Sequence, residues 1–265
     1  MNTQRTITLW QETPPGFTDS YGQPAPSITL YPVEGSKGIV LVLAGGGYHY
    51  KADHEGAPIA RRINQGGISA AVLDYRVTPY HAPVPQWDAL RAVQLLRSLA
   101  PEYGYQSDRI AILGFSAGGH LAASTSYLEI DLPGTTVNDP LAGINPLPNA
   151  AVLCYPVITL GAYTHQGSRD NLLGMNASAE LAAKWSVERH IKPDACPAFI
   201  WHTADDGAVP IQNSLMLAAA LAEQKVPFSL HIWPHGSHGL GLAENTEDIR
   251  RWPDLMIEWL RAQGY

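Results

Sequence analysis

Short apolar runs alternate with longer segments of helical spacing along most of this chain. Six runs have the length and composition of strands: Gly38–Ala44, Ile68–Tyr75, Arg109–Gly114, Ala150–Tyr155, Ala198–His202 and Phe228–Trp233. Most are apolar at almost every position, which is typical of parallel strands that helices cover on both faces. The spacing of apolar residues predicts helices near Pro58–Gln65, Gln86–Ala100, Ala117–Leu128, Glu180–Trp185, Ile211–Gln224 and Pro253–Gln263. This alternation predicts an α/β protein with three layers, α/β/α, around a mostly parallel central sheet of about eight strands.

Three segments fall outside the alternation. Residues 1–37 are rich in Pro and Gly, and we expect a lead-in with antiparallel edge strands there. Residues 129–149 form a loop with four prolines, and residues 156–195 contain long irregular stretches. Ligands of open α/β sheets bind beyond the carboxyl ends of the strands, so we interpret both segments as substrate-site walls or a small cap. Ordinary surface insertions explain any single residue there equally well. The prediction is a single domain over residues 1–265.

The composition of the chain limits which binding partners and which cellular location we expect. The 265 residues are 45% hydrophobic and 15% charged, which suits one large domain with an ample core. The formal net charge is −7 and no Lys/Arg run could follow a phosphate backbone, so nucleic acid is not an expected partner. No apolar run approaches the roughly 20 residues of a membrane span, and residues 1–10 lack the apolar core of a secretion signal. We therefore predict a cytoplasmic protein without a membrane partner, in which Cys154 and Cys196 are reduced.

A serine between two glycines joins the third apolar run to a helical segment of small residues. The sequence there is Gly114-Phe-Ser116-Ala-Gly118. In a strand–turn–helix context this motif places the serine on a sharp, strained turn with its hydroxyl clear of the sheet edge. The helix that begins at the serine directs its free N–H groups toward developing negative charge. The motif predicts Ser116 as a nucleophile, and a structural turn serine is the alternative.

A serine nucleophile needs a base, usually a histidine that a carboxylate orients. In proteins of this topology the chain order is Ser, then Asp or Glu, then His. Asp205 and Asp206 follow the fifth apolar run, and His235 and His238 follow the sixth. The two runs are separated by one predicted helix, so acid and base are expected at adjacent strand ends. Of the histidines we favour His238, and on position alone both aspartates stay open.

A glycine-rich loop continues directly from the first apolar run. Backbone N–H groups of Gly45–Gly47 can point inward without obstruction, and together with the N–H of Ala117 they would bind the oxyanion of a tetrahedral intermediate. A phosphate-binding loop is the alternative, but neither nucleotide fingerprint matches. Tyr48 and His49 follow the glycines and are predicted substrate contacts, with Tyr50 as a further candidate. Plain loop surface explains these three residues equally well.

Other histidines of the chain suggest roles different from that of the catalytic base. His231, His235 and His238 have a spacing that mimics a metal cluster, but two of them are expected in a loop without an acidic ligand nearby. We therefore predict no metal site. His120 follows the serine turn on the predicted helix, and we expect it to pack beneath Ser116 rather than to act as the base.

Seven segments carry a family resemblance over about residues 28–260. They are Gly45–Tyr48, Glu55–Ala60, Asp74–Val77, Gly114–His120, Leu153–Ile158, Trp201–Asp206 and His238–Gly241. They resemble the α/β-hydrolase superfamily, more closely bacterial esterases related to the hormone-sensitive-lipase type, in the subgroup of acetyl xylan and feruloyl esterases. The resemblance implies Ser116 as nucleophile, Asp206 as orienting acid and His238 as base.

The same resemblance implies Gly46, Gly47 and Ala117 as oxyanion donors. The loop often opens with His or Pro in this family, whereas this chain has Ala44. Which glycine donates therefore stays open.

The resulting hypothesis is a serine carboxylesterase that cleaves short acyl esters through an acyl-enzyme and requires no cofactor. Acetylated sugars or xylo-oligosaccharides are the expected substrates, because no long apolar lid is apparent that could hold a fatty chain. Arylformamidase and feruloyl esterase activity are alternatives on the same triad. A hydrolase fold retained as a non-catalytic binding protein is a further alternative, and it predicts a broken triad.

Overall fold

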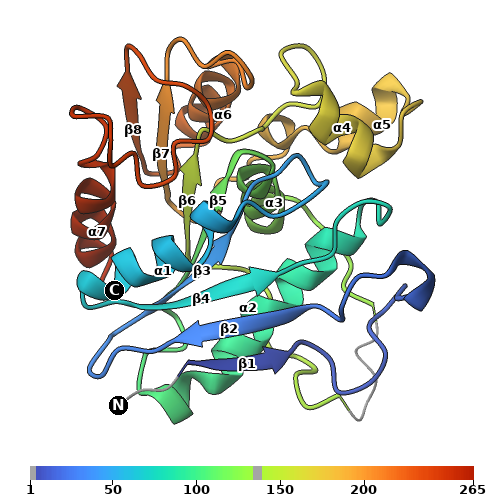
Figure 1. Ribbon diagram of the computed structural model, residues 1–265, viewed down its shortest axis with the longest axis vertical. Coiled ribbons are helices and arrows are strands. Elements are labelled where there is room, and N and C mark those ends of the chain that lie inside the picture. The colour runs from blue at the N-terminus through green and yellow to red at the C-terminus, as the bar shows by residue number, and fades with distance from the viewer. Residues whose placement is uncertain (1–3, 134–138) are drawn as a thin grey trace.

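Eight strands form one sheet in the computed structural model, which describes residues 4–133 and 139–265 (Figure 1). The spatial order is β1-β2-β4-β3-β5-β6-β7-β8. The strands are β1 (Arg5–Thr8), β2 (Ser27–Tyr31), β3 (Ile39–Leu43), β4 (Ser69–Asp74), β5 (Ile110–Phe115), β6 (Ala150–Cys154), β7 (Ala198–Thr203) and β8 (Phe228–Trp233). The six apolar runs thus coincide with β3–β8, and the predicted fold class is confirmed.

The two strands within residues 1–37 form the antiparallel edge. β1 pairs with β2 and β2 pairs with β4, both antiparallel. All other neighbours are parallel, including β3 beside β5 and β5 beside β6. β5 therefore lies inside the parallel part of the sheet, and the carboxyl ends of β3, β5, β6, β7 and β8 share one edge.

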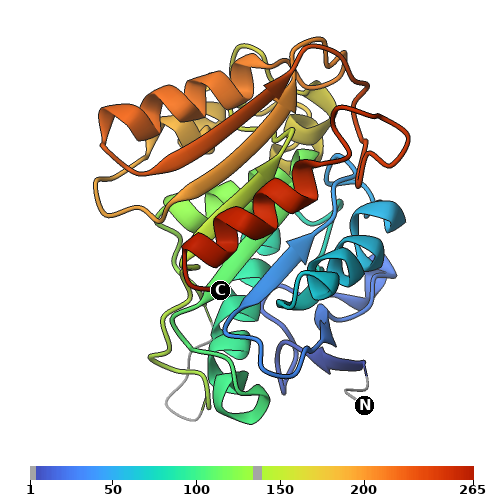
Figure 2. The same ribbon diagram turned by 90° about the vertical axis from the view of Figure 1, so that its left-hand side faces the viewer.

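Helices cover both faces of this sheet (Figure 2). The helices are α1 (Ala57–Gln65), α2 (Val84–Tyr103), α3 (Ser116–Tyr127), α4 (Gln166–Leu173), α5 (Ala179–Lys184), α6 (Gln212–Glu223) and α7 (Trp252–Ala262), with 3₁₀ turns at Asp19–Tyr21, Asp53–Glu55 and Val187–Arg189. Leu41 and Leu43 of β3 belong to the core that α2, α3 and α6 cover. Val40 and Val42 face the opposite core, which α1 and α7 cover. This alternation follows from the two-residue period of a strand, and it explains why β3 and β5 are apolar throughout.

The two insertions differ in what the structure describes. Residues 156–195 carry α4 and α5, which lie beyond the carboxyl ends of the strands at the upper right of Figure 1. The sequence predicts only the second of these helices. Part of the 129–149 loop, residues 134–138, lies outside the described residues. Whether the insertions form a cap, and whether the chain is a single domain, stay predictions.

A buried ion pair joins the segment after β4 to α2. The guanidinium and backbone N–H of Arg76 donate to the carboxylate of Asp88, with the shortest contact at 2.6 Å, and both side chains are almost fully buried. Trp10 and Tyr80 lie against the guanidinium. Such a pair resists the removal of either partner, because the other charge would be left buried and uncompensated.

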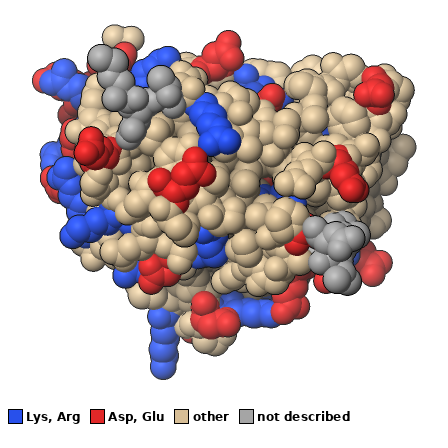
Figure 3. Space-filling model, turned by 90° about the horizontal axis from the view of Figure 1, so that it is seen from below, with Lys and Arg blue, Asp and Glu red and all other residues tan. Residues whose placement is uncertain are grey.

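Acidic and basic side chains are interspersed over the lower face of the molecule (Figure 3). No helix in the described part of the chain combines the length and the apolar character that crossing a bilayer requires. Cys154 and Cys196 are both free thiols.

Candidate active site

Ser116 stands on a strained turn between β5 and α3. Its φ is +52°, a left-handed backbone conformation that costs free energy for a residue with a Cβ. The flanking glycines allow this turn by their lack of side chains. A Cβ at Gly114 would lie 2.0 Å from the carbonyl oxygen of Gly118, and one at Gly118 would lie 2.4 Å from that of Leu43. The motif therefore encodes close backbone packing as well as the place of Ser116 at the wall of a cavity.

The structure brings Ser116, His238 and Asp206 into one hydrogen-bonded chain. His238 Nε2 lies 2.8 Å from Ser116 Oγ, and its Nδ1 lies 2.7 Å from Asp206 Oδ2. Asp206 follows β7 and His238 follows β8, so the three side chains come from separate loops at one edge of the sheet. The geometry allows the imidazole to take a proton from the hydroxyl while the carboxylate holds the other ring nitrogen.

Hydrogen bonds keep Asp206 ionised in spite of its burial. Burial alone would raise the pKa of this carboxyl, but hydrogen bonds from His202, His238 and the Val209 N–H outweigh burial and lower the pKa below its ordinary value. Oδ1 accepts from the N–H groups of Ala208 and Val209, each at 2.9 Å. The carboxylate is therefore fixed on one side by backbone and presents its other oxygen to His238.

The alternative acid and base pair with each other, away from Ser116. His235 Nδ1 lies 2.9 Å from Asp205 Oδ2, and both side chains are largely exposed. Asp205 also accepts from the N–H of Gly236. Asp205 and His235 therefore form a surface pair, whereas Asp206 and His238 face the serine.

The glycine loop lies against Ser116, and some of its N–H groups are available as hydrogen-bond donors. The N–H of Gly45 is not available to an oxyanion, because it donates to Glu55 Oε2 at 2.7 Å. In the part of the chain that the structure describes, the N–H groups of Gly46 and Gly47 have no hydrogen-bond partner. A Cβ at Gly46 would lie 2.2 Å from the carbonyl oxygen of Tyr50, and its φ is +126°. Ala117 lies in the first turn of α3, where N–H groups have no partner within the helix. The arrangement leaves Gly46, Gly47 and Ala117 as the candidate oxyanion donors.

A cavity of about 340 Å³ opens beside Ser116 and His238. His49 and Tyr50 line it, together with Gly46 and Gly47. Tyr48 requires a correction, because its side chain is fully buried rather than directed into this cavity. Its hydroxyl lies 2.8 Å from His120 Nδ1. Its φ is +57°, a left-handed backbone conformation.

Asn171 of α4 and His165 at the N-cap of this helix belong to the cavity wall, and the sequence did not predict either residue. Asn171 donates from Nδ2 to the carbonyl oxygen of Gly47 at 2.8 Å, which ties α4 to the glycine loop. His165 lines the cavity, and its Nδ1 accepts from the N–H of Ser168. Because a backbone N–H can only donate, the ring proton of neutral His165 lies on Nε2. Burial and the neighbouring His238 lower the pKa of His165, which favours this neutral form.

Glu55 also stands out only in the structure, as a buried carboxylate at the cavity wall. The sequence signal for it was its place in a segment that carries the family resemblance. For His165 and Asn171 no local signal exists, since Asn171 meets Gly47 across 124 residues of chain.

Two buried histidines, His120 and His202, have hydrogen-bond partners within the protein. His120 lies between the Tyr48 hydroxyl and the carbonyl oxygen of Trp185, and burial lowers its pKa to about 4. His202 contacts the Ser214 hydroxyl and the carbonyl oxygen of Val209. Across residues 4–133 and 139–265, no group of three His, Cys, Asp or Glu side chains could hold a metal ion.

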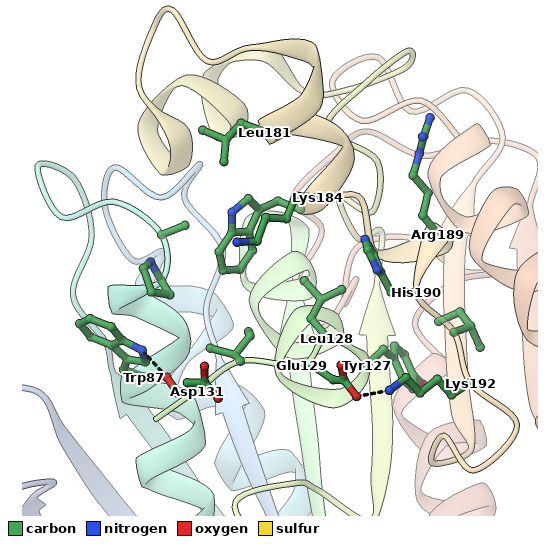
Figure 4. Close-up of a pocket in the computed structure, with 15 residues that line it drawn as sticks. Trp87, Tyr127, Leu128, Glu129, Asp131, Leu181, Lys184, Arg189, His190 and Lys192 are labelled. Atoms are coloured by element: carbon green, nitrogen blue, oxygen red, sulfur yellow. Dashed lines mark hydrogen bonds and ion pairs between the residues drawn. The ribbon is translucent and has the colours of Figure 1, made fainter. Parts of the chain in front are cut away.

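A larger cavity of about 800 Å³ lies between the start of α2, the end of α3 and α5 (Figure 4). Trp87 and Lys184 line it, and an ion pair between Lys192 and Glu129 lies at one side. None of the candidate catalytic side chains belongs to its wall.

The chain is similar to one protein family and to several known proteins. The profile of the BD-FAE family matches residues 29–221. Endo-1,4-beta-xylanase B of Butyrivibrio fibrisolvens is 37% identical over 251 residues, which are 92% of this chain and 39% of that protein. Acetylxylan esterase of Xylanibacter ruminicola is 28% identical over 226 residues, 82% of this chain and 44% of that protein. The chain thus spans about two fifths of the length of these curated relatives.

A solved structure matches along nearly the whole chain. The acetyl ester-xyloside bifunctional hydrolase from Caldicellulosiruptor lactoaceticus has a TM-score of 0.91 and 40% identity, and the match covers 98% of this chain and 96% of that one. The predicted resemblance to α/β hydrolases of the acetyl xylan esterase type is confirmed.

Proposed function

Because this chain belongs to the BD-FAE family, we propose that it is a carboxylic ester hydrolase that removes acetyl groups from sugars or xylo-oligosaccharides. Acetylxylan esterase and acetyl ester-xyloside hydrolase among its relatives support the reaction and the substrate class. The observation that carries the proposal is the hydrogen-bonded chain from Ser116 through His238 to Asp206 at the wall of a cavity.

In the proposed mechanism, Ser116 Oγ attacks the ester carbonyl while His238 Nε2 takes the hydroxyl proton. The negative charge that develops on the carbonyl oxygen is stabilised by the N–H groups of Gly46, Gly47 and Ala117, and one such donor is worth about 10²–10³ in kcat. His238 then protonates the leaving sugar alcohol, and Asp206 stabilises the imidazolium during both transfers. Water, activated by the same histidine, cleaves the acetyl-enzyme and releases acetate. Protein side chains, backbone and water suffice for this sequence of steps.

The size and walls of the cavity favour a short acyl group on a polar alcohol. Its volume of about 340 Å³ lies at the lower end of the roughly 300–1,000 Å³ of small-molecule sites. The side chains of His49, His165 and Asn171 line it, and their polar atoms suit the hydroxyl groups of a sugar better than a long hydrocarbon chain.

The test combines covalent labelling with substrate profiling. Wild-type protein should react with a fluorophosphonate probe and Ser116→Ala should not, since the probe captures an activated serine. Acetylated xylo-oligosaccharides should release acetate, and among p-nitrophenyl esters kcat/KM should fall as the acyl chain lengthens from acetyl to octanoyl. Failure of the wild type to label would point to a binding protein, and equal labelling of both proteins would show that Ser116 is not the residue that reacts with the probe. Faster cleavage of methyl ferulate or of N-formylkynurenine would replace the proposed substrate class.

A further inference from the structure

A buried carboxylate links the two loops that complete the candidate site. Glu55 is only 2% exposed, so its oxygens need hydrogen-bond donors. Oε2 accepts from the N–H of Gly45 at 2.7 Å, and Oε1 accepts from the Tyr155 hydroxyl at 2.6 Å. Both distances are short for their kind. Gly45 begins the glycine loop, so this carboxylate holds the loop at the residue next to the candidate oxyanion donors.

Tyr155 continues the connection to the loop that carries His238. Its hydroxyl oxygen accepts from the N–H of Gly241 at 2.9 Å, which leaves its own proton for Glu55. The Tyr155 ring lies edge-on to the His238 ring, with centroids 5.0 Å apart. His54, beside Glu55, donates from Nε2 to the carbonyl oxygen of Gly239 at 2.9 Å. The 3₁₀ turn Asp53–Glu55 thus contacts the glycine loop and the base loop at once.

We propose that Glu55 and Tyr155 are positioning residues whose hydrogen-bonded bridge fixes the oxyanion donors relative to His238. The proposal rests on the proposed function and adds two residues to it, neither of which touches the reacting atoms in the mechanism above. Gly46 and Gly47 have N–H groups without partners in the described chain, and the neighbouring Gly45 is held by Glu55. Displacement of a catalytic group by about 1 Å can cost about 10²-fold in rate. The bridge therefore acts on the transition state, in which both loops engage the substrate.

The experiment compares Tyr155→Phe, Glu55→Gln and the double variant in the hydrolysis of p-nitrophenyl acetate. Each single change removes part of the bridge while keeping the shape of the side chain. We expect kcat to fall about 10–100-fold with KM changed by less than about threefold, because the bridge acts on transition-state geometry. The inhibition constant of phenylboronic acid, whose serine adduct is tetrahedral, should rise by a similar factor. The kcat of the double variant should be little lower than that of the more impaired single variant, since either single change already breaks the bridge.

The matched control is Tyr127→Phe. Tyr127 is also a buried tyrosine, and its hydroxyl donates to the carbonyl oxygen of Cys196, outside the candidate site. This variant should keep the wild-type kcat. Melting temperatures verify that each variant is folded, and Tyr155→Phe carries the test alone if Glu55→Gln does not fold.

The outcomes separate the bridge from the proposed function. Values of kcat within threefold of wild type in both single variants overturn the bridge, and so do losses that multiply in the double variant. If Ser116→Ala abolishes activity while the bridge variants remain fully active, the proposed function stands and only the bridge fails. Full activity of Ser116→Ala overturns both.

Discussion

Replacement of Asp206 by asparagine should disable the base without removing any atom from the site. The two oxygens of Asp206 have different surroundings. Oδ1 accepts from the N–H groups of Ala208 and Val209, whereas Oδ2 faces Nδ1 of His238 at 2.7 Å and Nε2 of His202 at 3.3 Å. In Asp206→Asn the amide oxygen must take the Oδ1 position, since an NH₂ group there would oppose two donors. The amide NH₂ group then points at His238.

An NH₂ group in that place reverses the tautomer of His238. Its Nδ1 must accept a hydrogen bond from the new amide, so the ring proton moves to Nε2, which is the nitrogen 2.8 Å from Ser116 Oγ. A protonated Nε2 cannot take the serine proton. Loss of the useful tautomer costs about 10⁴-fold in kcat in a serine triad, which corresponds to about 5.4 kcal/mol in the activation barrier.

The assay is steady-state hydrolysis of p-nitrophenyl acetate, with circular dichroism to establish that the variant is folded. Asp205→Asn is the matched control, because it makes the same chemical change in the neighbouring residue, whose partner His235 is exposed. That variant should stay within about twofold of wild type, as exposed pairs contribute little. A folded Asp206→Asn that keeps more than a tenth of the wild-type kcat would refute the tautomer argument, as would an equal loss in Asp205→Asn.

Three further predictions follow from buried or cavity-lining groups. His165→Ala should raise KM for acetylated xylo-oligosaccharides more than for p-nitrophenyl acetate, because Nε2–H of His165 is a donor available to a sugar oxygen. Measured kcat and KM values for both substrates check this prediction, and an equal rise of KM for both would contradict it. Burial lowers the pKa of His120 from 6.5 to about 4, so its contribution to stability is complete above pH 6.5 and falls as the pH drops toward 4. Between pH 7 and pH 5 the free energy of unfolding should lose roughly 2 kcal/mol from this group, and urea titrations should show a smaller pH dependence in His120→Gln than in wild type. Asp88→Ala should lower the free energy of unfolding by about 3–5 kcal/mol, because it leaves the guanidinium of Arg76 buried without its carboxylate; a change below 1 kcal/mol in urea titration would show that the pair is dispensable.

The apolar runs predicted the central strands well because these strands are buried on both faces. The run Ile68–Tyr75 contains β4 with one residue to spare at each end. Edge strand β1 could be placed only as a region, since three of its four residues are exposed and carry no clear pattern. α4 was missed for a related reason. Only Ser168 and Leu172 are buried in it, and its N-cap is a histidine rather than one of the usual capping residues.

The candidate catalytic residues could be predicted because topology brings their loops together. The carboxyl ends of parallel strands meet at one sheet edge, so residues that follow β5, β7 and β8 are expected near one another. The misplacement of Tyr48 shows the limit of this reasoning. Its neighbours Gly47 and His49 do line the cavity, but the direction of a side chain after three glycines depends on local φ values, and composition does not specify those values.

The position of His238 requires more than the sheet can supply. β8 lies three strands from β5 in the sheet, and strands are spaced by about 4.8 Å, so the base loop must return across about 14 Å to reach Ser116. This loop passes Tyr155, which directly follows β6, and the centroids of the Tyr155 and His238 rings lie 5.0 Å apart. Both backbone polar groups of Gly241 are hydrogen-bonded in this loop: its N–H donates to the Tyr155 hydroxyl, and its carbonyl oxygen accepts from Trp252 Nε1. The histidine is therefore located by side chains beneath its loop rather than by its own strand, and substitutions at these contacts can displace the base while the sheet stays intact.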